Sequence, residues 1–225
     1  MNTTGAYGNV ISAKKSEENL KTEKRRAYTV VKRTLDVLVS FFGLVLLLPF
    51  FLVIIIVIRI DSKGKAVFTQ TRIGKDGKPF KFYKFRSMCD DAERKRAELM
   101  HLNERDGPAF KINKDPRITA VGAFIRKYSI DELPQLLNIL KGDMSFVGPR
   151  PPLPCEVEQY SEFHKKRLDI RGGLTCYWQI SGRSNITFDD WVKMDIKYIE
   201  EMSFYTDLKI FLKTFKVVFA RKGAC

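Results

Sequence analysis

An uncharged stretch over residues 37–58 constrains the fold of this chain more than any other feature. It reads VLVSFFGLVLLLPFFLVIIIVI and contains no Asp, Glu, Lys or Arg. A helix needs about 20 apolar residues to cross a bilayer, and a helix in a globular core is rarely apolar on every face. The sequence therefore predicts a membrane-inserted helix. A cleaved signal peptide is not expected, because the stretch is too long and starts too far from Met1.

Pro49 lies near the middle of this stretch, where it removes a helical hydrogen bond and clashes with the preceding turn. Positive charge marks the cytoplasmic side of a membrane helix, and here it flanks both ends. A re-entrant hairpin that enters and leaves the same leaflet satisfies both flanks, whereas a kinked single span, the alternative, leaves one cluster outside. The flanking basic residues are Lys24, Arg25, Arg26, Lys32 and Arg33 before the stretch and Arg59, Lys63 and Lys65 after it.

The formal net charge of +14 points to anionic partners: nucleic acid, phosphorylated small molecules or an acidic membrane face. The apolar stretch argues against nucleic acid, which is not expected as a partner. The four cysteines form no CxxC pair, and the chain has only two histidines. A zinc site or a disulfide framework is therefore not expected, and a reducing compartment fits better.

The rest of the chain mixes short strands with helices. Residues 66–71 and 80–86 predict a β-hairpin around the turn formers of residues 74–79. Helices are expected over residues 90–103, 119–128, 133–140, 156–168, 189–202 and 208–220, and Gly142 stands where the C-terminal glycine of a helix belongs. The last helix has two open interpretations: a helix in the membrane interface, or one packed on the core with a solvated lysine stripe. Its lysines are Lys209, Lys213 and Lys216, opposite Phe211, Leu212, Phe215 and Phe219.

The stretch SIDELPQ over residues 129–135 places Asp131 beside Glu132, just before a helix. A capping box from Ser129 to Glu132 conflicts with Pro134, which would then lie past the first turn; a cap at Asp131 puts that proline inside the first turn. Helix N-termini favour ionised carboxylates, which suit a nucleophile toward phosphorus or a Mg²⁺ ligand. Helix capping and catalysis both stay open for this pair.

Cations near these acids in the sequence favour a phosphate site. Arginine pairs with phosphate oxygens through two hydrogen bonds, and prolines stiffen the loop around Arg150. Each basic residue alone is more typical of a solvated surface, but together they predict phosphate binding around Asp131. No GxxxxGK[ST] loop or GxGxxG turn is present. The candidate phosphate ligands are Lys84, Arg86, Arg117, Arg126, Arg150 and Arg183.

Seven segments in one order resemble the bacterial monotopic phosphoglycosyl transferases, also called sugar transferases. The likeness covers residues 32–223. The segments are Lys32-Arg33 with Asp36, FTQTRIG at 68–74, KFRSM at 84–88, DPRIT at 115–119, SIDELPQ at 129–135, KGDMSFVGPRP at 141–151 and WQISGR at 178–183.

The resemblance implies that a UDP-sugar gives its sugar-1-phosphate to undecaprenyl phosphate, releasing UMP and starting a surface glycan. It implies that Asp131 is the nucleophile that forms a covalent phosphosugar intermediate, and that Glu132, with Asp131, binds Mg²⁺. Arg126 and Arg150 are implied to contact phosphates. The segment at 106–112 resembles members that transfer hexose phosphates. The site is expected on the cytoplasmic face of the bacterial inner membrane.

The expected fold is an α+β monotopic membrane protein with a re-entrant helix-break-helix hairpin, a small β-hairpin and several amphipathic interfacial helices. Residues 1–27 are expected to be a flexible basic tail on anionic membrane lipid, residues 28–60 the hairpin, and residues 61–225 a cytoplasmic catalytic domain. Two departures from the family are Leu48, where relatives often have a small polar residue before the proline, and Gly172-Gly173 with Cys176. A non-enzymatic membrane scaffold is the rival function, and a homo-oligomer stays an alternative to a monomer.

Overall fold

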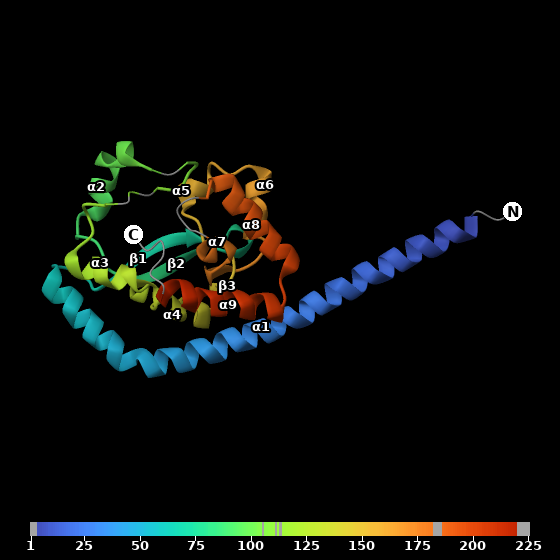
Figure 1. Ribbon diagram of the computed structural model, residues 1–225, viewed down its shortest axis with the longest axis horizontal. Helices are drawn as coiled ribbons and strands as arrows, with labels where there is room; N and C mark the ends of the chain where they lie inside the picture. The colour runs from blue at the N-terminus through green and yellow to red at the C-terminus, as the bar shows by residue number, and fades with distance from the viewer. Residues whose placement is uncertain (1–3, 105, 111, 113, 182–185, 220–225) are drawn as a thin grey trace.

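The computed structural model describes residues 4–104, 106–110, 112, 114–181 and 186–219. Within the first helix, side chains are described for residue 23 and from residue 25 onward. This helix, α1 (Thr4–Asp61), runs beneath the remaining elements and bends in its second half, with the other elements on the concave side (Figure 1). In the described residues it is the one helix long and apolar enough to cross a membrane, with a mean hydropathy of 3.3 in its most apolar window.

Two predictions for α1 differ from the structure. The helix-break-helix is replaced by one helix that stays continuous through Pro49 and bends, because a bend relieves the clash of the proline ring without unwinding the chain. The backbone of residues 4–27 is helical, which differs from the irregular backbone expected of a flexible tail; its many Lys, Glu and Ala residues favour helix without an apolar face. A flexible attachment of this segment stays a prediction. Re-entry into one leaflet stays a prediction.

The predicted β-hairpin is confirmed. Strands β1 (Val67–Ile73) and β2 (Pro79–Phe85) pair antiparallel, and the 3-10 turn η1 (Lys75–Gly77) joins them. Asp76 and Gly77 in this turn have φ of 57° and 73°, the left-handed values that a tight reversal requires. The hairpin packs against α4, which follows the acid pair.

The helices follow the predicted order with corrections at residues 90–103, which form a short helix and a separate 3-10 turn, and at residues 156–168. This segment is three short pieces and not one helix, because Ser161 starts a new helix by accepting a hydrogen bond from the backbone N–H of His164. The last helix begins at Phe204, earlier than predicted, and residue 220 lies outside the described part. The helical elements are α2 (Ala92–Glu98), η2 (Met100–Leu102), α3 (Ala120–Lys127), η3 (Ile130–Glu132), α4 (Gln135–Lys141), α5 (Pro154–Val157), α6 (Glu162–Lys165), η4 (Lys166–Leu168), α7 (Tyr177–Ile180), α8 (Phe188–Glu201) and α9 (Phe204–Phe219).

A second, parallel pair of strands lies between α4 and α9. Strand β3 (Met144–Val147) pairs with β4 (Gly172–Thr175). A Cβ on Gly173 would lie 2.1 Å from the backbone nitrogen of Gly148, so no larger side chain fits there. The Gly172-Gly173 departure therefore has a structural role: these glycines let the chain after β3 approach β4 closely.

Three hydrophobic clusters hold these elements together. The largest is aromatic and joins α7, α8 and α9 to β3. The second packs Ile54 and Ile58 of α1 against Phe85 of β2 and Ile125 of α3. The third joins β2, α4 and β3. Strand β2 contributes to the second and third clusters. The turn that carries the acid pair contacts β2 and therefore lies next to both packed regions.

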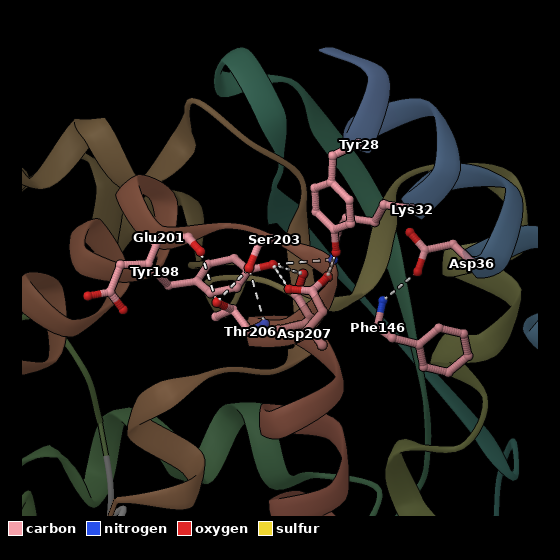
Figure 2. A network of polar contacts seen from close by, with 10 residues as sticks. Tyr28, Lys32, Asp36, Phe146, Tyr198, Glu201, Ser203, Thr206 and Asp207 are labelled. Atoms are coloured by element: carbon pink, nitrogen blue, oxygen red, sulfur yellow. Dashed lines mark hydrogen bonds and ion pairs between the residues drawn. The ribbon is translucent and has the colours of Figure 1, made fainter. Parts of the chain in front are cut away.

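A polar network fixes α1 to α9 at the start of the apolar stretch (Figure 2). The Tyr28 hydroxyl donates to Asp207 Oδ2 over 2.7 Å, and Lys32 forms an ion pair with the same carboxylate. Tyr198 donates to Asp207 Oδ1 over 2.7 Å. Nearby, Asp36 accepts a hydrogen bond from the backbone N–H of Phe146. These contacts place the membrane helix against the rest of the chain.

The structure shows that one face of α9 packs on the core. Ile210 is fully buried, and the Thr214 hydroxyl lies 2.7 Å from that of Thr175. The opposite side stays exposed and carries both apolar and basic residues. Its exposed members are Phe204, Tyr205, Leu208, Lys209, Leu212, Lys213, Phe215 and Lys216. A position in the membrane interface stays a prediction for this exposed side.

Candidate active site

The acid pair lies on η3, a single 3-10 turn between α3 and α4. Ser129 enters this turn with a left-handed backbone (φ 55°, ψ 21°), which is uncommon for a residue other than glycine and stores local strain. This turn buries the Asp131 carboxylate and leaves Glu132 half-buried. Strained backbone of this kind clusters at functional sites.

The predicted helix cap at Asp131 is wrong, and the capping box from Ser129, against which Pro134 argued, does not form. Ser129 and Pro134 precede the two helical pieces, and neither makes a side-chain capping bond. The N–H groups of Glu132 and Leu133 bond to backbone carbonyls within the 3-10 turn, and α4 starts only after Pro134. The structure therefore separates Asp131 from the start of α4. The predicted C-terminal glycine is confirmed: Gly142 has φ 93° and its N–H bonds to the carbonyl of Asn138.

Lys84, on β2, contacts both acids. Its Nζ lies 2.7 Å from Asp131 Oδ2 and 3.8 Å from Glu132 Oε1. The Asp131 side chain is 3% exposed, whereas those of Lys84 and Glu132 are 24% and 35% exposed. One side of the pair is therefore open to a ligand. The prediction placed Lys84 near an anionic ligand, and the structure brings it to the two carboxylates.

Arg126 approaches the acids from the last turn of α3. Its Nε donates to the hydroxyl of Ser87 over 2.7 Å, and Ser87 is buried. Burial lowers the pKa of the Arg126 guanidinium, while the negative charge of Asp131 acts in the opposite direction. Ser87 was not predicted as a site residue. Its position in the KFRSM segment was the available signal, because it follows directly after a basic strand.

Arg150 is exposed on the proline-rich loop, and Arg72 supports this loop from β1. Arg72 donates to the carbonyl of Pro151 over 3.1 Å, and its guanidinium lies 5.3 Å from the ring centre of Phe82. Burial, followed by the charge of Arg150, lowers the pKa of Arg72 to about 9, and Glu132 opposes this shift. Arg72 was missed as a site residue: it stands in the FTQTRIG segment, but its partners lie far along the chain.

Two other predicted phosphate ligands bind protein groups. Arg86 donates to the carbonyls of Ser62 and Lys63 at the end of α1, over 2.6 and 2.7 Å. Arg117 makes two hydrogen bonds to the Asp115 carboxylate, over 2.9 and 2.6 Å. Phosphate binding by these two arginines stays a prediction, as it does for Arg183, which lies outside the described residues.

Asp131 and Glu132 fit Mg²⁺ by the chemistry of their donor atoms. In the described part of the chain, no group of three or more His, Cys, Asp or Glu side chains converges. Mg²⁺ is commonly bound by one or two carboxylates, with substrate phosphates and water completing its octahedral shell. Two adjacent carboxylates beside several cations supply such a partial set. A divalent ion in this site would thus depend on oxygens from a phosphorylated ligand.

Comparison with known proteins extends these observations. The bacterial sugar transferase family profile matches residues 27–221. The chain is 49% identical over 199 residues to galactosyl transferase CpsE of Streptococcus agalactiae, covering 88% of this chain and 44% of that protein. It is 41% identical to the undecaprenyl-phosphate galactose phosphotransferase of Salmonella typhimurium, covering 89% and 43%. Identity to exopolysaccharide production protein ExoY of Rhizobium meliloti is 39%, covering 87% and 88%.

The chain thus spans less than half the length of the first two relatives and most of the third. The family match covers α1 from residue 27, the acid-bearing turn, the arginine loop and all of α9. It therefore includes every described residue of the candidate active site. This chain belongs to the bacterial sugar transferase family.

Proposed function

We propose that this chain transfers a sugar-1-phosphate, from a UDP-hexose, to undecaprenyl phosphate and so initiates a surface polysaccharide. The observation that carries this proposal is the buried Asp131 carboxylate, held against Lys84 in a site that is open at Glu132. The names of the relatives support the substrates: one is a galactosyl transferase, and another is named for galactose phosphate and undecaprenyl phosphate. UDP-galactose is the first donor to test.

In the first step a carboxylate oxygen of Asp131 attacks the phosphorus that carries the sugar. The bond from this phosphorus to the bridging oxygen breaks, and UMP leaves with that oxygen and its electron pair. Burial of Asp131 limits competition by water, and Lys84 and Arg126 supply positive charge where negative charge develops. The product is an acyl phosphate between Asp131 and the sugar phosphate.

In the second step a phosphate oxygen of undecaprenyl phosphate attacks the same phosphorus. The acyl phosphate bond breaks, the Asp131 carboxylate is regenerated, and the lipid carries a diphosphate-linked sugar. No water and no redox partner are consumed. Because the acceptor enters after UMP has left, the two phosphates need not share the site at once.

Asp131 and Glu132 would hold Mg²⁺ together with the donor diphosphate. The ion would neutralise charge on the diphosphate oxygens. In this assignment Lys84 positions the carboxylates and Arg150 binds an outer phosphate oxygen, because it is exposed on a loop that Arg72 holds in place.

The site is proposed to face the cytoplasm on the bacterial inner membrane, with α1 re-entering one leaflet. Both flanks of the apolar stretch are basic, and the soluble elements lie on the concave side of the bent helix. A tag before residue 24 and a second tag after residue 222 should both react from the cytoplasmic side. Labelling of the two tags from opposite sides would show a spanning helix.

Intact-protein mass spectrometry tests the covalent step. After brief exposure to UDP-galactose and Mg²⁺ without acceptor, the wild-type chain should gain the mass of a hexose phosphate, and Asp131→Asn should not. Asp76→Asn is the matched control, because Asp76 is exposed and has a left-handed backbone that asparagine also adopts. An undiminished adduct on Asp131→Asn would exclude Asp131 as nucleophile. Absence of UMP release from a panel of UDP-sugars with acceptor would favour the scaffold.

A further inference from the structure

A concave surface, the basic groove, lies at the end of α4 opposite the acid pair. Its volume is about 300 Å³, and α1, the hairpin turn η1 and the loop after η4 line it. Concave surfaces of one charge sign concentrate ions of the other sign. Its charged lining residues are the cations Arg25, Arg26, Lys32, Arg33, Lys75 and Arg171 and the anions Asp36 and Asp169.

Three cations of the groove are exposed and come from two separate segments. Arg25 and Arg26 lie on α1, and Lys75 lies on η1 with Asp76 4.0 Å away. Arg33 and Arg171 have a different role, because both donate to backbone carbonyls at the end of α4. The groove thus has exposed cations at its rim, whereas two of its other arginines are held by hydrogen bonds to the backbone.

An apolar hollow of about 200 Å³ adjoins the basic groove between α1 and α9. Lys32 and Asp36 line both, and Figure 2 shows these two side chains extending from α1 toward α9 and β3. The basic groove lies at the start of the apolar stretch of α1, where lipid headgroups would meet the helix. The apolar residues of the hollow are Leu35, Val39, Phe146, Val147, Phe204, Leu208 and Phe211.

A basic groove beside an apolar hollow matches an amphiphile with a phosphate at one end. The reacting phosphate is an unsuitable occupant, because α4 separates the groove from Asp131. A helix rises 1.5 Å per residue, so the seven residues of α4 span roughly 10 Å. Reacting atoms must approach to about 3 Å. A phosphate in the groove is therefore remote from the transfer chemistry.

We propose that the basic groove and the apolar hollow together bind one anionic glycerophospholipid of the surrounding membrane. Its phosphate lies among Arg25, Arg26 and Lys75, and an acyl chain enters the hollow. This lipid is not consumed, and its binding is independent of the proposed transfer reaction. The bound lipid would fix the depth of α1 in the membrane. It would do so near the end of α4, where Arg33 and Arg171 donate to backbone carbonyls.

Electron paramagnetic resonance with spin-labelled lipids tests the site on the full chain in nanodiscs. Phosphatidylglycerol and phosphatidylcholine carrying the same acyl label are compared, and the motionally restricted fraction gives their relative association. Wild type should favour phosphatidylglycerol. Each basic residue near a membrane surface contributes about a five-fold preference, so Arg26→Gln with Lys75→Gln should lower the selectivity at least about five-fold. Lys78→Gln with Lys193→Gln removes equal charge outside the groove and away from the exposed side of α9, and should retain it.

Four results would overturn the proposal. The first is a groove variant that matches wild type. The second is a control pair that loses as much selectivity, which would indicate general surface charge. The third is displacement of the labelled lipid by excess inorganic phosphate, which would indicate a site for soluble phosphate. Displacement by one equivalent of undecaprenyl phosphate would instead identify an acceptor site. Lys75→Gln alone, in an exposed turn, provides a variant that leaves the core and α1 unchanged.

Discussion

Two buried carboxylates in this molecule, Asp131 and Asp195, each pair with a cation, but the two cations differ in their exposure to solvent. Asp195 pairs with Arg167, both side chains are fully buried, and the guanidinium stacks 4.6 Å from the ring centre of Trp191. Asp131 is almost as buried, but its partner Lys84 reaches the surface. The first pair is closed by the aromatic core on all sides. The second has one open side, so only Asp131 can exchange its cation for a ligand.

This difference separates a structural role from a chemical one. A buried pair that is enclosed contributes to the specificity of packing, and removal of one partner leaves an uncompensated charge. A pair with a partly exposed lysine holds the carboxylate in place and leaves a route of approach. The same residue type therefore supports the core in one region and reactivity in the other.

Asp131→Asn should give the largest effect on activity. The amide is not a nucleophile toward phosphorus, so turnover should fall by about 10,000-fold, which corresponds to about 5.5 kcal/mol. The amide keeps the shape of the side chain, and the thermal unfolding midpoint should change little. UMP release and thermal unfolding in detergent measure the two quantities. Near-normal turnover would contradict a chemical role for Asp131.

Asp195→Asn should give the largest effect on stability. It leaves Arg167 buried without its charge partner, and the free energy of unfolding should fall by about 4 kcal/mol. The double replacement Arg167→Met with Asp195→Leu should recover most of this loss, because it removes both charges. Denaturant unfolding in detergent checks both variants. A stability loss of the same size in Asp131→Asn would show that the two pairs are equivalent.

Lys84→Gln should lower activity strongly and stability less than Asp195→Asn does. Turnover should fall by about 100-fold, or about 2.7 kcal/mol, because a positive charge beside the reacting phosphate is lost. The free energy of unfolding should fall by less than about 4 kcal/mol, the loss expected for Asp195→Asn, since Arg126 still acts on the Asp131 charge. Lys84→Arg should restore part of the turnover. Steady-state kinetics with parallel unfolding curves measure this; a loss of stability as large as that of Asp195→Asn would contradict it.

Asp115 pairs with Arg117, and the contribution of this pair to the stability of the fold should depend on pH. Burial raises the pKa of this carboxyl, but the hydrogen bonds and charge of Arg117 outweigh it and hold the pKa below its usual range. The folded pKa is then lower than the unfolded one, so the ionised form stabilises the fold above the unfolded pKa near 4. This contribution is lost as the pH falls through the folded pKa.

Asp115→Asn should therefore lower the free energy of unfolding by about 2 kcal/mol at neutral pH. The difference from wild type should shrink below about pH 4, where Asp115 in the wild-type chain takes up its proton. Unfolding midpoints measured from about pH 7 to about pH 3 test this. A constant difference across that range would show that the ion pair does not carry the effect.

Local patterns were sufficient to predict much of the fold. The alternation and turn formers of residues 66–86 predicted β1 and β2, and the spacing of leucines before Gly142 predicted α4 and its end. These elements depend on contacts between residues near in sequence. The helix at residues 156–168 was predicted as one piece because composition does not reveal where a serine such as Ser161 restarts a helix.

The candidate site was predicted less completely. The acid pair and Lys84 were identified, and the structure brings them together. Arg72 was missed, whereas Arg86 and Arg117 proved to bind protein groups. All three are arginines beside apolar residues, so nothing local distinguishes them. Their roles depend on partners such as Pro151 and Ser62, which are distant in the chain.

The sequence by itself determined that this chain has a membrane-compatible helix, a β-hairpin and two adjacent carboxylates before a short helix. It did so because hydrophobic length, alternation and turn residues act locally. Only the tertiary structure decided that Asp131 is buried beside Lys84, that α1 bends without a break, and that a basic groove forms behind α4. Burial and charge pairing arise from segments far apart in the chain, so they become defined only when the chain packs.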